Sequence, residues 1–217
     1  MKFKGIIFDL DGTLVNSLED LADSMNTVLQ NHNFPTHAIP AYKHFIGNGI
    51  RNLVYKTLPE TNRDEILITE CYDLMIEEYR NNSVNKTKPY DGITGLLDEL
   101  VSRNMKLAVF SNKADEFTKK IVLTLLPEWN FEAIVGLSND AHKKPNPFVA
   151  LQISEKLGIR PEDMIYVGDS GTDMQTANNA GMYAVGALWG FRTKEELISN
   201  GAMCLINNPL DLISIIE

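Results

Sequence analysis

The sequence predicts an α/β protein: a Rossmann-like parallel β-sheet covered by helices and interrupted by an inserted all-helical domain. Three observations predict this class. Short apolar runs alternate with helical segments through the second half of the chain, as in a parallel sheet. A strand-like run at residues 3–9 is followed by a wholly helical stretch at residues 16–87. Polar residues follow several apolar runs directly, which is typical of ligand sites at the carboxyl ends of parallel strands.

The first predicted strand, residues 3–9, is apolar without alternation, as expected for a strand buried on both faces. The insert begins with a helix over residues 17–31, whose apolar residues form one stripe. Further amphipathic stretches follow, including residues 62–80, and the polar stretch NNSVNKTKP resembles a linker. We therefore expect a core of residues 1–15 and 88–217 and a helical cap of residues 16–87.

Beyond the linker, helical and strand-like segments alternate. Gly158 and Gly181 each follow a helical pattern at the position where glycine commonly ends a helix. The patterns predict helices at 93–103, 114–126, 146–157, 172–180 and 194–199, and strands at 106–110, 133–137, 164–167, 183–188 and 203–206.

Composition narrows the possible partners. The 217 residues carry a formal net charge of −9, which argues against a general nucleic-acid or anionic-membrane binder. The two cysteines cannot form a disulfide framework, which favours a reducing cytoplasmic location. No apolar stretch approaches the roughly 20 residues of a membrane helix. We expect no nucleic-acid or membrane partner, and a monomer or homodimer.

Polar side chains should meet where three predicted strands end. Asp9 ends the first strand, and Asp11 follows it closely; such neighbouring carboxylates are costly unless something pairs with them. A common edge would bring further groups to them: Ser111 and Asn112, Lys144, Asp169 and Asp173. Hard carboxylate oxygens suit Mg²⁺, which would neutralise the carboxylates.

Four motifs in order, FDLDGTL, SN, KP and GDSGTD, resemble the signature of the haloacid dehalogenase-like phosphatases. The resemblance spans nearly the whole chain, and the insert is similar to the small helical cap of that family. Within the family, GNGIR, PYDG and ALWGFRTKEEL are most similar to the phosphoglycolate phosphatases. The match departs at Asn16 and Asp91, where the family often has Asp and Pro.

The resemblance implies catalytic roles for four residues. Asp9 would be the nucleophile that forms an aspartyl-phosphate, and Asp11 the general acid/base. Ser111 would donate a hydrogen bond to phosphate, and Lys144 would meet developing negative charge.

The resemblance also implies ligands for the metal and the substrate. Mg²⁺ would be held by Asp9, Asp11 and Asp169, with Asp173 orienting Asp169, water or Lys144. The expected substrate-binding residues are Thr13, Gly47, Asn48, Arg51 and Asn112. Backbone N–H groups near Gly47 and the guanidinium of Arg51 could face a substrate carboxylate.

Other readings of these residues stay open. Ser111 and Asp173 could be helix caps only, and Arg51 a surface residue beside a glycine turn. The leading function is a magnesium-dependent phosphatase of a small phosphorylated metabolite, with 2-phosphoglycolate the first candidate. A phosphosugar mutase, a pyrophosphatase, a dehalogenase and a non-catalytic binding module are the alternatives.

Overall fold

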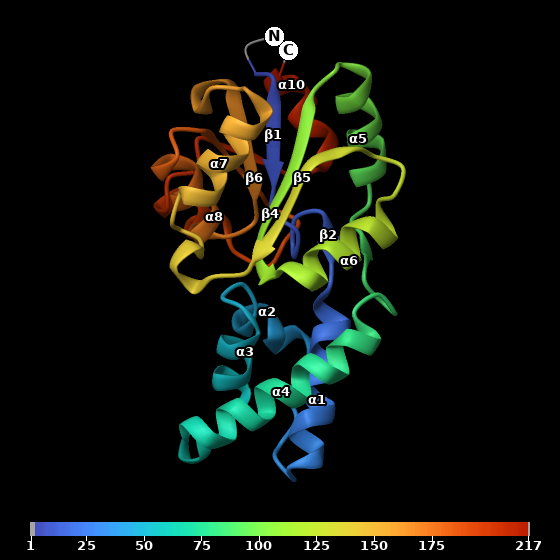
Figure 1. Cartoon of the computed structure of the whole chain (residues 1–217), viewed down its shortest axis with the longest axis vertical. Coiled ribbons are helices and arrows are strands. Elements are labelled where there is room, and N and C mark those ends of the chain that lie inside the picture. Colours follow the sequence, from blue (N-terminus) through green and yellow to red (C-terminus); the bar gives the residue numbers. More distant parts are fainter. Residues whose placement is uncertain (1–2, 217) are drawn as a thin grey trace. The chain divides into compact units, whose positions relative to one another are not determined.

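The computed structural model describes residues 3–216, and the chain divides into two compact units. Residues up to Asn16 and from Pro89 onward form the first, the sheet unit. Ser17–Lys88 form the second, the helical unit. Figure 1 shows the elements of both units in sequence colours.

The sheet unit is built on six parallel strands in the order β5-β4-β1-β6-β7-β8. The predicted α/β fold with a parallel sheet is therefore confirmed. The strands are β1 (Gly5–Phe8), β4 (Lys106–Ala114), β5 (Phe131–Leu137), β6 (Met164–Gly168), β7 (Tyr183–Ala187) and β8 (Cys204–Ile206).

The central strand, β1, sets the edge at which the polar residues meet. All four of its residues are buried, as predicted from its unbroken apolar run. Phe8 is in register with Val109 of β4 and with Val167 of β6. Asp9 continues this pairing, because its N–H donates to the carbonyl oxygen of Val167 at 2.9 Å. The residues that follow β1, β4 and β6 therefore come together at one edge.

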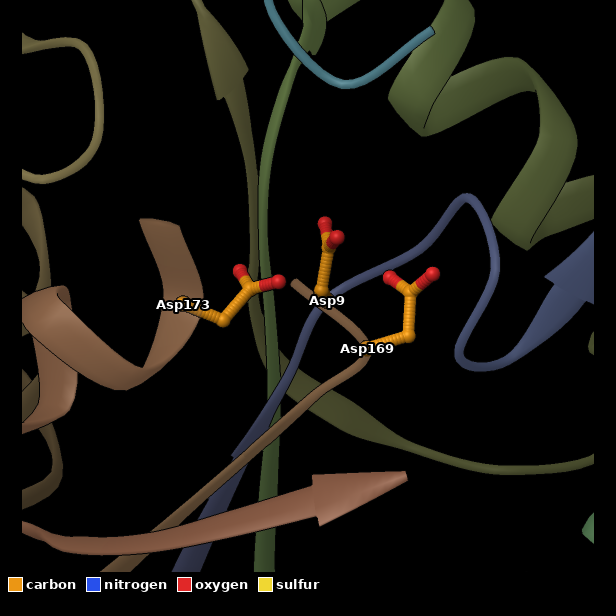
Figure 2. Close-up of side chains that lie close together, drawn as sticks. All are labelled: Asp9, Asp169 and Asp173. Atoms are coloured by element: carbon orange, nitrogen blue, oxygen red, sulfur yellow. The ribbon is translucent and has the colours of Figure 1, made fainter. Parts of the chain in front are cut away.

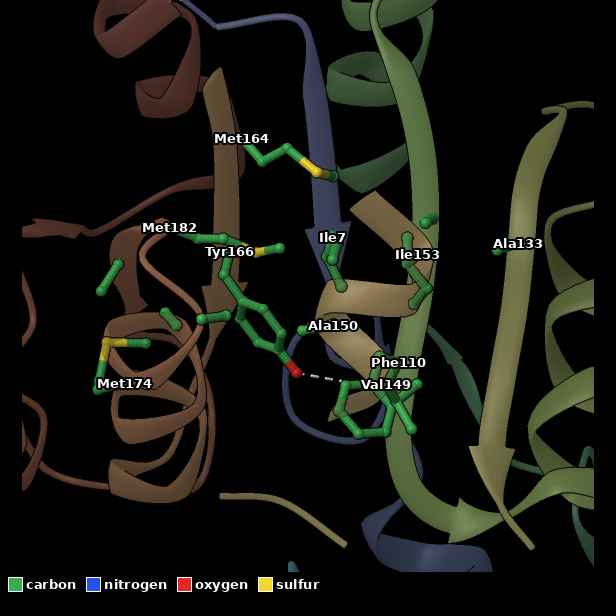
Figure 3. Packing of buried hydrophobic residues seen from close by; sticks show 14 of the residues in the cluster. Ile7, Phe110, Ala133, Val149, Ala150, Ile153, Met164, Tyr166, Met174 and Met182 are labelled. Carbon is green, nitrogen blue, oxygen red and sulfur yellow. Dashed lines mark hydrogen bonds between the residues drawn. The ribbon is translucent and has the colours of Figure 1, made fainter. Parts of the chain in front are cut away.

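Helices cover both faces of the sheet (Figure 1). On one face lie α5 (Ile93–Ser102) and α6 (Asp115–Leu125), and on the other α7 (Phe148–Leu157) and α8 (Gly171–Asn179). Figure 3 shows the apolar cluster that α7 and α8 form with the sheet. Ile7 and Tyr166 lie at its centre, and the Tyr166 hydroxyl donates to the carbonyl oxygen of Phe110 at 3.4 Å. The chain continues through α9 (Lys194–Ser199) and ends with α10 (Ile213–Ile216).

Several elements of the sheet unit differ in their bounds from the sequence prediction, and two of these differences have a clear physical reason. The predicted strand 106–110 extends to Ala114, because pairing with β5 resumes at Ala114 and Leu137 after an irregular stretch. The predicted helix at 146–157 begins at Phe148, because Pro147 takes the N-cap position. The extension of β4 keeps the Ser-Asn-Lys sequence in extended backbone.

The helical unit consists of four α-helices and two short 3₁₀ helices, at Ile39–Ala41 and Glu60–Asn62. Its long helices pack through buried residues such as Met25 of α1 and Met75 of α4. Where the chain passes between the units, β2 (Val15–Asn16) and β3 (Lys88–Pro89) form a two-stranded sheet. The helices are α1 (Leu18–Asn31), α2 (Tyr42–Phe45), α3 (Ile50–Thr57) and α4 (Glu65–Asn82). None of the helices described in residues 3–216 has the length and apolar character needed to cross a membrane.

A buried carboxylate joins the first helix of the helical unit to its last residues. Asp20 of α1 is 2% exposed. Its oxygens accept hydrogen bonds from the N–H of Lys86 at 3.0 Å and from the N–H and hydroxyl of Thr87 at 2.8 and 2.6 Å. The polar segment that resembles a linker in the sequence is thus anchored at its C-terminal end.

We expect Asp20→Ala to lower the free energy of unfolding by about 3 kcal/mol, because it leaves buried backbone donors without an acceptor. Asp23→Ala is the matched control. Asp23 lies on the same helix and pairs with Lys86 Nζ at 2.6 Å, but both side chains are about half exposed. That pair should contribute little to stability, because solvent screens an exposed ion pair. Urea unfolding followed by circular dichroism compares the two variants, and equal losses would contradict the anchoring role.

Candidate active site

Three buried carboxyl groups converge at the carboxyl edge of the sheet. Asp9 follows β1, Asp169 follows β6, and Asp173 lies in the first turn of α8. One oxygen from each lies within 4.8 Å of the other two. Figure 2 shows the Asp9 carboxyl group between those of Asp173 and Asp169. The shared edge predicted from the sequence therefore brings these three residues together.

Lys144 joins two of these carboxyl groups. Its Nζ lies 2.9 Å from Asp9 Oδ1 and 2.6 Å from Asp173 Oδ1, and it also donates to the carbonyl oxygen of Phe110 at 3.3 Å. The Lys144 side chain is only 3% exposed. Burial alone would lower the pKa of Lys144, but Asp173 and Asp9 raise it well above its ordinary value. Lys144 therefore stays positively charged within this cluster.

Asp173 is held in place by the start of its own helix. The Ser170 hydroxyl and N–H donate to Asp173 Oδ2 at 2.6 and 3.1 Å, and the Asp173 N–H donates back to Ser170 Oγ at 3.4 Å. This reciprocal arrangement is a capping box. Asp173 thus serves both as a helix cap and as a partner of Lys144, which combines two roles that the sequence left as alternatives.

Asp169 is fixed by a loop from the C-terminal part of the sheet unit. The N–H of Phe191 donates to Asp169 Oδ2 at 2.7 Å. A Cβ atom on Gly190 would lie 2.3 Å from Asp169 Cβ and 2.5 Å from the carbonyl oxygen of Gly12. Only glycine allows this close approach. Next to it, Trp189 Nε1 donates to the carbonyl oxygen of Thr13 at 3.0 Å, which ties the loop to the segment after β1.

The cluster holds more negative than positive charge, and this affects its titration. Burial, followed by the charge of Asp173, raises the pKa of Asp9 to about 7 against the opposing effect of Lys144. Burial, followed by the charges of Asp173 and Asp9, also raises the pKa of Asp169 well above its usual range. The charges of these carboxyl groups are therefore costly unless a further cation neutralises them.

Asp11 has a different partner. Both of its oxygens face Nζ of Lys113, at 2.9 and 2.8 Å, and Asp11 lies outside the three-carboxylate cluster. The residues before Lys113 make contacts within the same edge. Ser111 Oγ accepts from the N–H of Lys113 at 3.2 Å, and Asn112 Oδ1 accepts from the N–H of Lys144 at 2.9 Å. Asn112 therefore fixes the backbone that carries Lys144.

The turn after β1 uses its backbone donors internally. The N–H of Gly12 donates to Val15 at 2.9 Å and that of Thr13 to Leu10 at 3.3 Å. Thr13 Oγ1 is buried, and no hydrogen-bond partner for it lies among residues 3–216. Thr13 thus contributes to the shape of the turn through its backbone.

The remaining predicted binding residues belong to the helical unit. Gly47 and Asn48 precede Gly49, the N-cap of α3. Arg51, in the first turn of α3, pairs with Glu65 of α4, and its Nη2 lies 3.3 Å from Thr69 Oγ1. The Arg51 side chain is 45% exposed. Within this unit, the guanidinium group therefore connects α3 to α4.

Two features of the site were missed by sequence reasoning. Lys113 directly follows Ser111 and Asn112 at the end of a predicted strand, so its position alone was a signal that it reaches the edge. The hydrogen bond from the Phe191 N–H to Asp169 cannot be predicted in this way. Every residue except proline has a backbone N–H, so the residue type does not mark this donor. The resemblance of ALWGFRTKEEL marks this loop but does not indicate a contact with Asp169.

Comparisons with known proteins agree with this geometry. A family model described as haloacid dehalogenase-like hydrolase matches residues 6–187. A phosphoglycolate phosphatase of Aquifex aeolicus is 34% identical over 212 residues, which cover 98% of this chain and 96% of the relative. One from Chromobacterium violaceum is 29% identical over 217 residues, covering 99% and 96%.

Solved structures agree as well. The crystal structure of a predicted phosphoglycolate phosphatase from Haemophilus somnus superposes with a TM-score of 0.90 at 27% identity. The match covers 100% of this chain and 99% of the other. The match over residues 6–187 spans all four motifs on which the resemblance rests. The chain therefore belongs to the haloacid dehalogenase-like hydrolases.

Proposed function

We propose that this hydrolase releases phosphate from a small phosphomonoester, with 2-phosphoglycolate as the preferred substrate, through an aspartyl-phosphate on Asp9. The predicted class, a phosphoric monoester hydrolase, agrees with the phosphatase names of its relatives. We also propose that the protein binds a small phosphorylated metabolite and that it is located in the cytoplasm.

The observation that carries the proposal is the setting of the Asp9 carboxyl group. Asp9 Oδ1 accepts from the N–H of Leu10 at 2.7 Å and faces Lys144. Among residues 3–216, no group donates a hydrogen bond to Asp9 Oδ2. A buried carboxylate held through one oxygen, beside a lysine ammonium group, suits attack on phosphorus.

The donor set fits a magnesium ion. Both oxygens of Asp173 are engaged, by Lys144 and Ser170. In contrast, Asp9 Oδ2 and Asp169 Oδ1 accept no hydrogen bond from the residues that the structure describes. These two carboxylates are thus suited to hold the ion, and burial, followed by the charges of neighbouring carboxylates, raises their pKa values. Asp11 is the third proposed ligand, and because both of its oxygens contact Lys113 it would share one of them between the lysine and the ion. When bound, Mg²⁺ would supply positive charge that draws phosphate to the site.

The side chains of the site then have the following roles in the reaction. Asp9 attacks phosphorus while Asp11 gives a proton to the leaving oxygen, and Asp11 later takes a proton from the water that cleaves the intermediate. Ser111, Asn112 and Lys144 receive the phosphate oxygens. Asp173 keeps Lys144 aimed at Asp9, since its Oδ1 contacts the same ammonium group.

We expect Asp9→Asn to lower turnover by at least about a thousandfold, because an amide cannot form an acyl-phosphate. Phosphate release from 2-phosphoglycolate measures this, with and without Mg²⁺. Wild-type activity should disappear with a chelator and return with Mg²⁺ but not with Ca²⁺, whose looser coordination misplaces the attacking oxygen.

Asp98→Asn is the control for this substitution. Asp98 is exposed on α5, where it accepts from Trp129 Nε1 at 2.9 Å, and its replacement should keep full turnover. Turnover of Asp9→Asn within about tenfold of wild type would exclude Asp9 as the nucleophile. Full wild-type activity after chelation would exclude the metal.

A second measurement on Asp9→Asn tests the charge balance of the site. The folded pKa of about 7 exceeds the ordinary value of 3.8. As the pH rises between these values, the unfolded chain loses this proton first, so the metal-free folded protein loses stability. Asparagine does not titrate. In chelator, the melting temperature of Asp9→Asn relative to wild type should therefore rise by about 4 °C between about pH 5 and pH 8. A constant difference would contradict the raised pKa.

For the substrate, we expect kcat/KM for 2-phosphoglycolate to exceed that for glucose 6-phosphate and pyrophosphate by at least about tenfold. The similarity of the chain to phosphoglycolate phosphatases supports this expectation. If another substrate is preferred, the substrate assignment is wrong and the phosphatase assignment stands.

Arg51→Ala extends the test to the helical unit. A lower preference would assign the substrate carboxylate to Arg51, whereas an unchanged one leaves Arg51 as the partner of Glu65.

A further inference from the structure

Lys113 is a second buried lysine at the edge of the sheet. Its side chain is 3% exposed, and that of Asp11 is 12% exposed. The ammonium group lies 2.9 Å from Oδ1 and 2.8 Å from Oδ2 of Asp11. Contact with both oxygens restrains the direction in which the carboxyl group points. The two residues are 102 positions apart in the chain, so this pair joins the turn after β1 to the end of β4.

Stability alone gives a poor reason for such a pair. Burying two charges costs desolvation free energy that their attraction often fails to recover. An exposed lysine on the same strand makes the comparison clear. Lys106 Nζ lies 2.7 Å from Glu132 Oε1, and the Lys106 side chain is 52% exposed. The Lys113–Asp11 pair also joins an ammonium group to a carboxylate, but both side chains are largely buried in the site.

The two buried lysines serve different carboxyl groups. Lys144 contacts Asp9 and Asp173, whereas Lys113 contacts Asp11. The backbone N–H of Lys113 also donates to Ser111 Oγ at 3.2 Å. Lys113 thus contacts two side chains with proposed roles in the reaction, although it has no such role itself in the proposed function.

We propose that Lys113 is a positioning residue that holds the Asp11 carboxyl group in place as the general base for cleavage of the aspartyl-phosphate. This inference rests on the proposed function. In that step, a water oxygen forms a bond to phosphorus, the bond from phosphorus to the Asp9 oxygen breaks, and the water proton goes to Asp11. Lys113 itself takes no part in the proton transfer. Its ammonium group contacts both Asp11 oxygens, so the carboxyl group keeps one position while it receives the proton.

The test uses p-nitrophenyl phosphate, whose leaving group needs no proton from the enzyme. With this substrate kcat/KM reports the phosphorylation of Asp9, while kcat includes its dephosphorylation. We expect Lys113→Met to lower kcat by at least about tenfold, with kcat/KM within about threefold of wild type. Rapid-quench measurements should then show a burst of p-nitrophenol close to one per enzyme. Lys106→Met should behave as wild type.

A double-mutant cycle separates positioning from general damage. If Lys113 acts through Asp11, adding Lys113→Met to Asp11→Asn should leave kcat of the single Asp11→Asn variant unchanged. The double variant also removes both charges of the pair, so it checks the result where Lys113→Met alone leaves a buried charge and folds poorly. Circular dichroism verifies the fold of each variant.

The outcomes are distinct. A parallel fall in kcat and kcat/KM without a burst, or independent effects in the cycle, would overturn the role of Lys113. Activity of Asp9→Asn near that of wild type would instead refute the proposed function.

Discussion

The ammonium group of Lys144 is the contact on which the arrangement of the site depends. It lies between Asp9 and Asp173, and all three side chains are almost fully buried. Without this charge, the two carboxylates would repel each other in a medium of low dielectric constant. Two other features support this contact: Asn112 holds the Lys144 backbone, and the capping box holds Asp173.

The parallel sheet makes this arrangement possible because it aligns strand ends that are far apart in the chain. Around Asp169, three segments of the chain lie as close together as packing allows. Gly12, Asp169 and Gly190 come from three separate segments and leave no space for a Cβ atom on either glycine. Such packing fixes a carboxyl group without using additional charge. It also explains how one side of Asp169 is held by a backbone N–H while its other oxygen stays available.

Much of the fold and part of the site could be predicted from the sequence, for physical reasons. The unbroken apolar run before Asp9 identifies a central strand, and the regular alternation of patterns identifies the parallel sheet. Residues that end such strands, like Asp9 and Asp169, must share an edge. Partner choice is different, because it depends on side-chain directions that no periodicity encodes. The sequence could not show that Asp11 faces Lys113.

The same limit applies in the helical unit. The spacing of Arg51 and Glu65 does not reveal that α3 and α4 bring them together. Contacts made by backbone groups cannot be predicted from residue types either, since the N–H of Phe191 would be present with any residue except proline.

The Asp20 anchor has a consequence for how such a protein could have been assembled. Asp20 lies near the start of the helical unit, and the residues that it binds, Lys86 and Thr87, lie at the end. The two ends of the unit are thus fastened to each other by contacts within the unit itself. A segment whose ends meet can occupy a short loop of a host domain without separating the host's strands. The helical unit therefore has the construction of an exchangeable module, which recombination could replace while leaving the chemistry of the sheet edge intact.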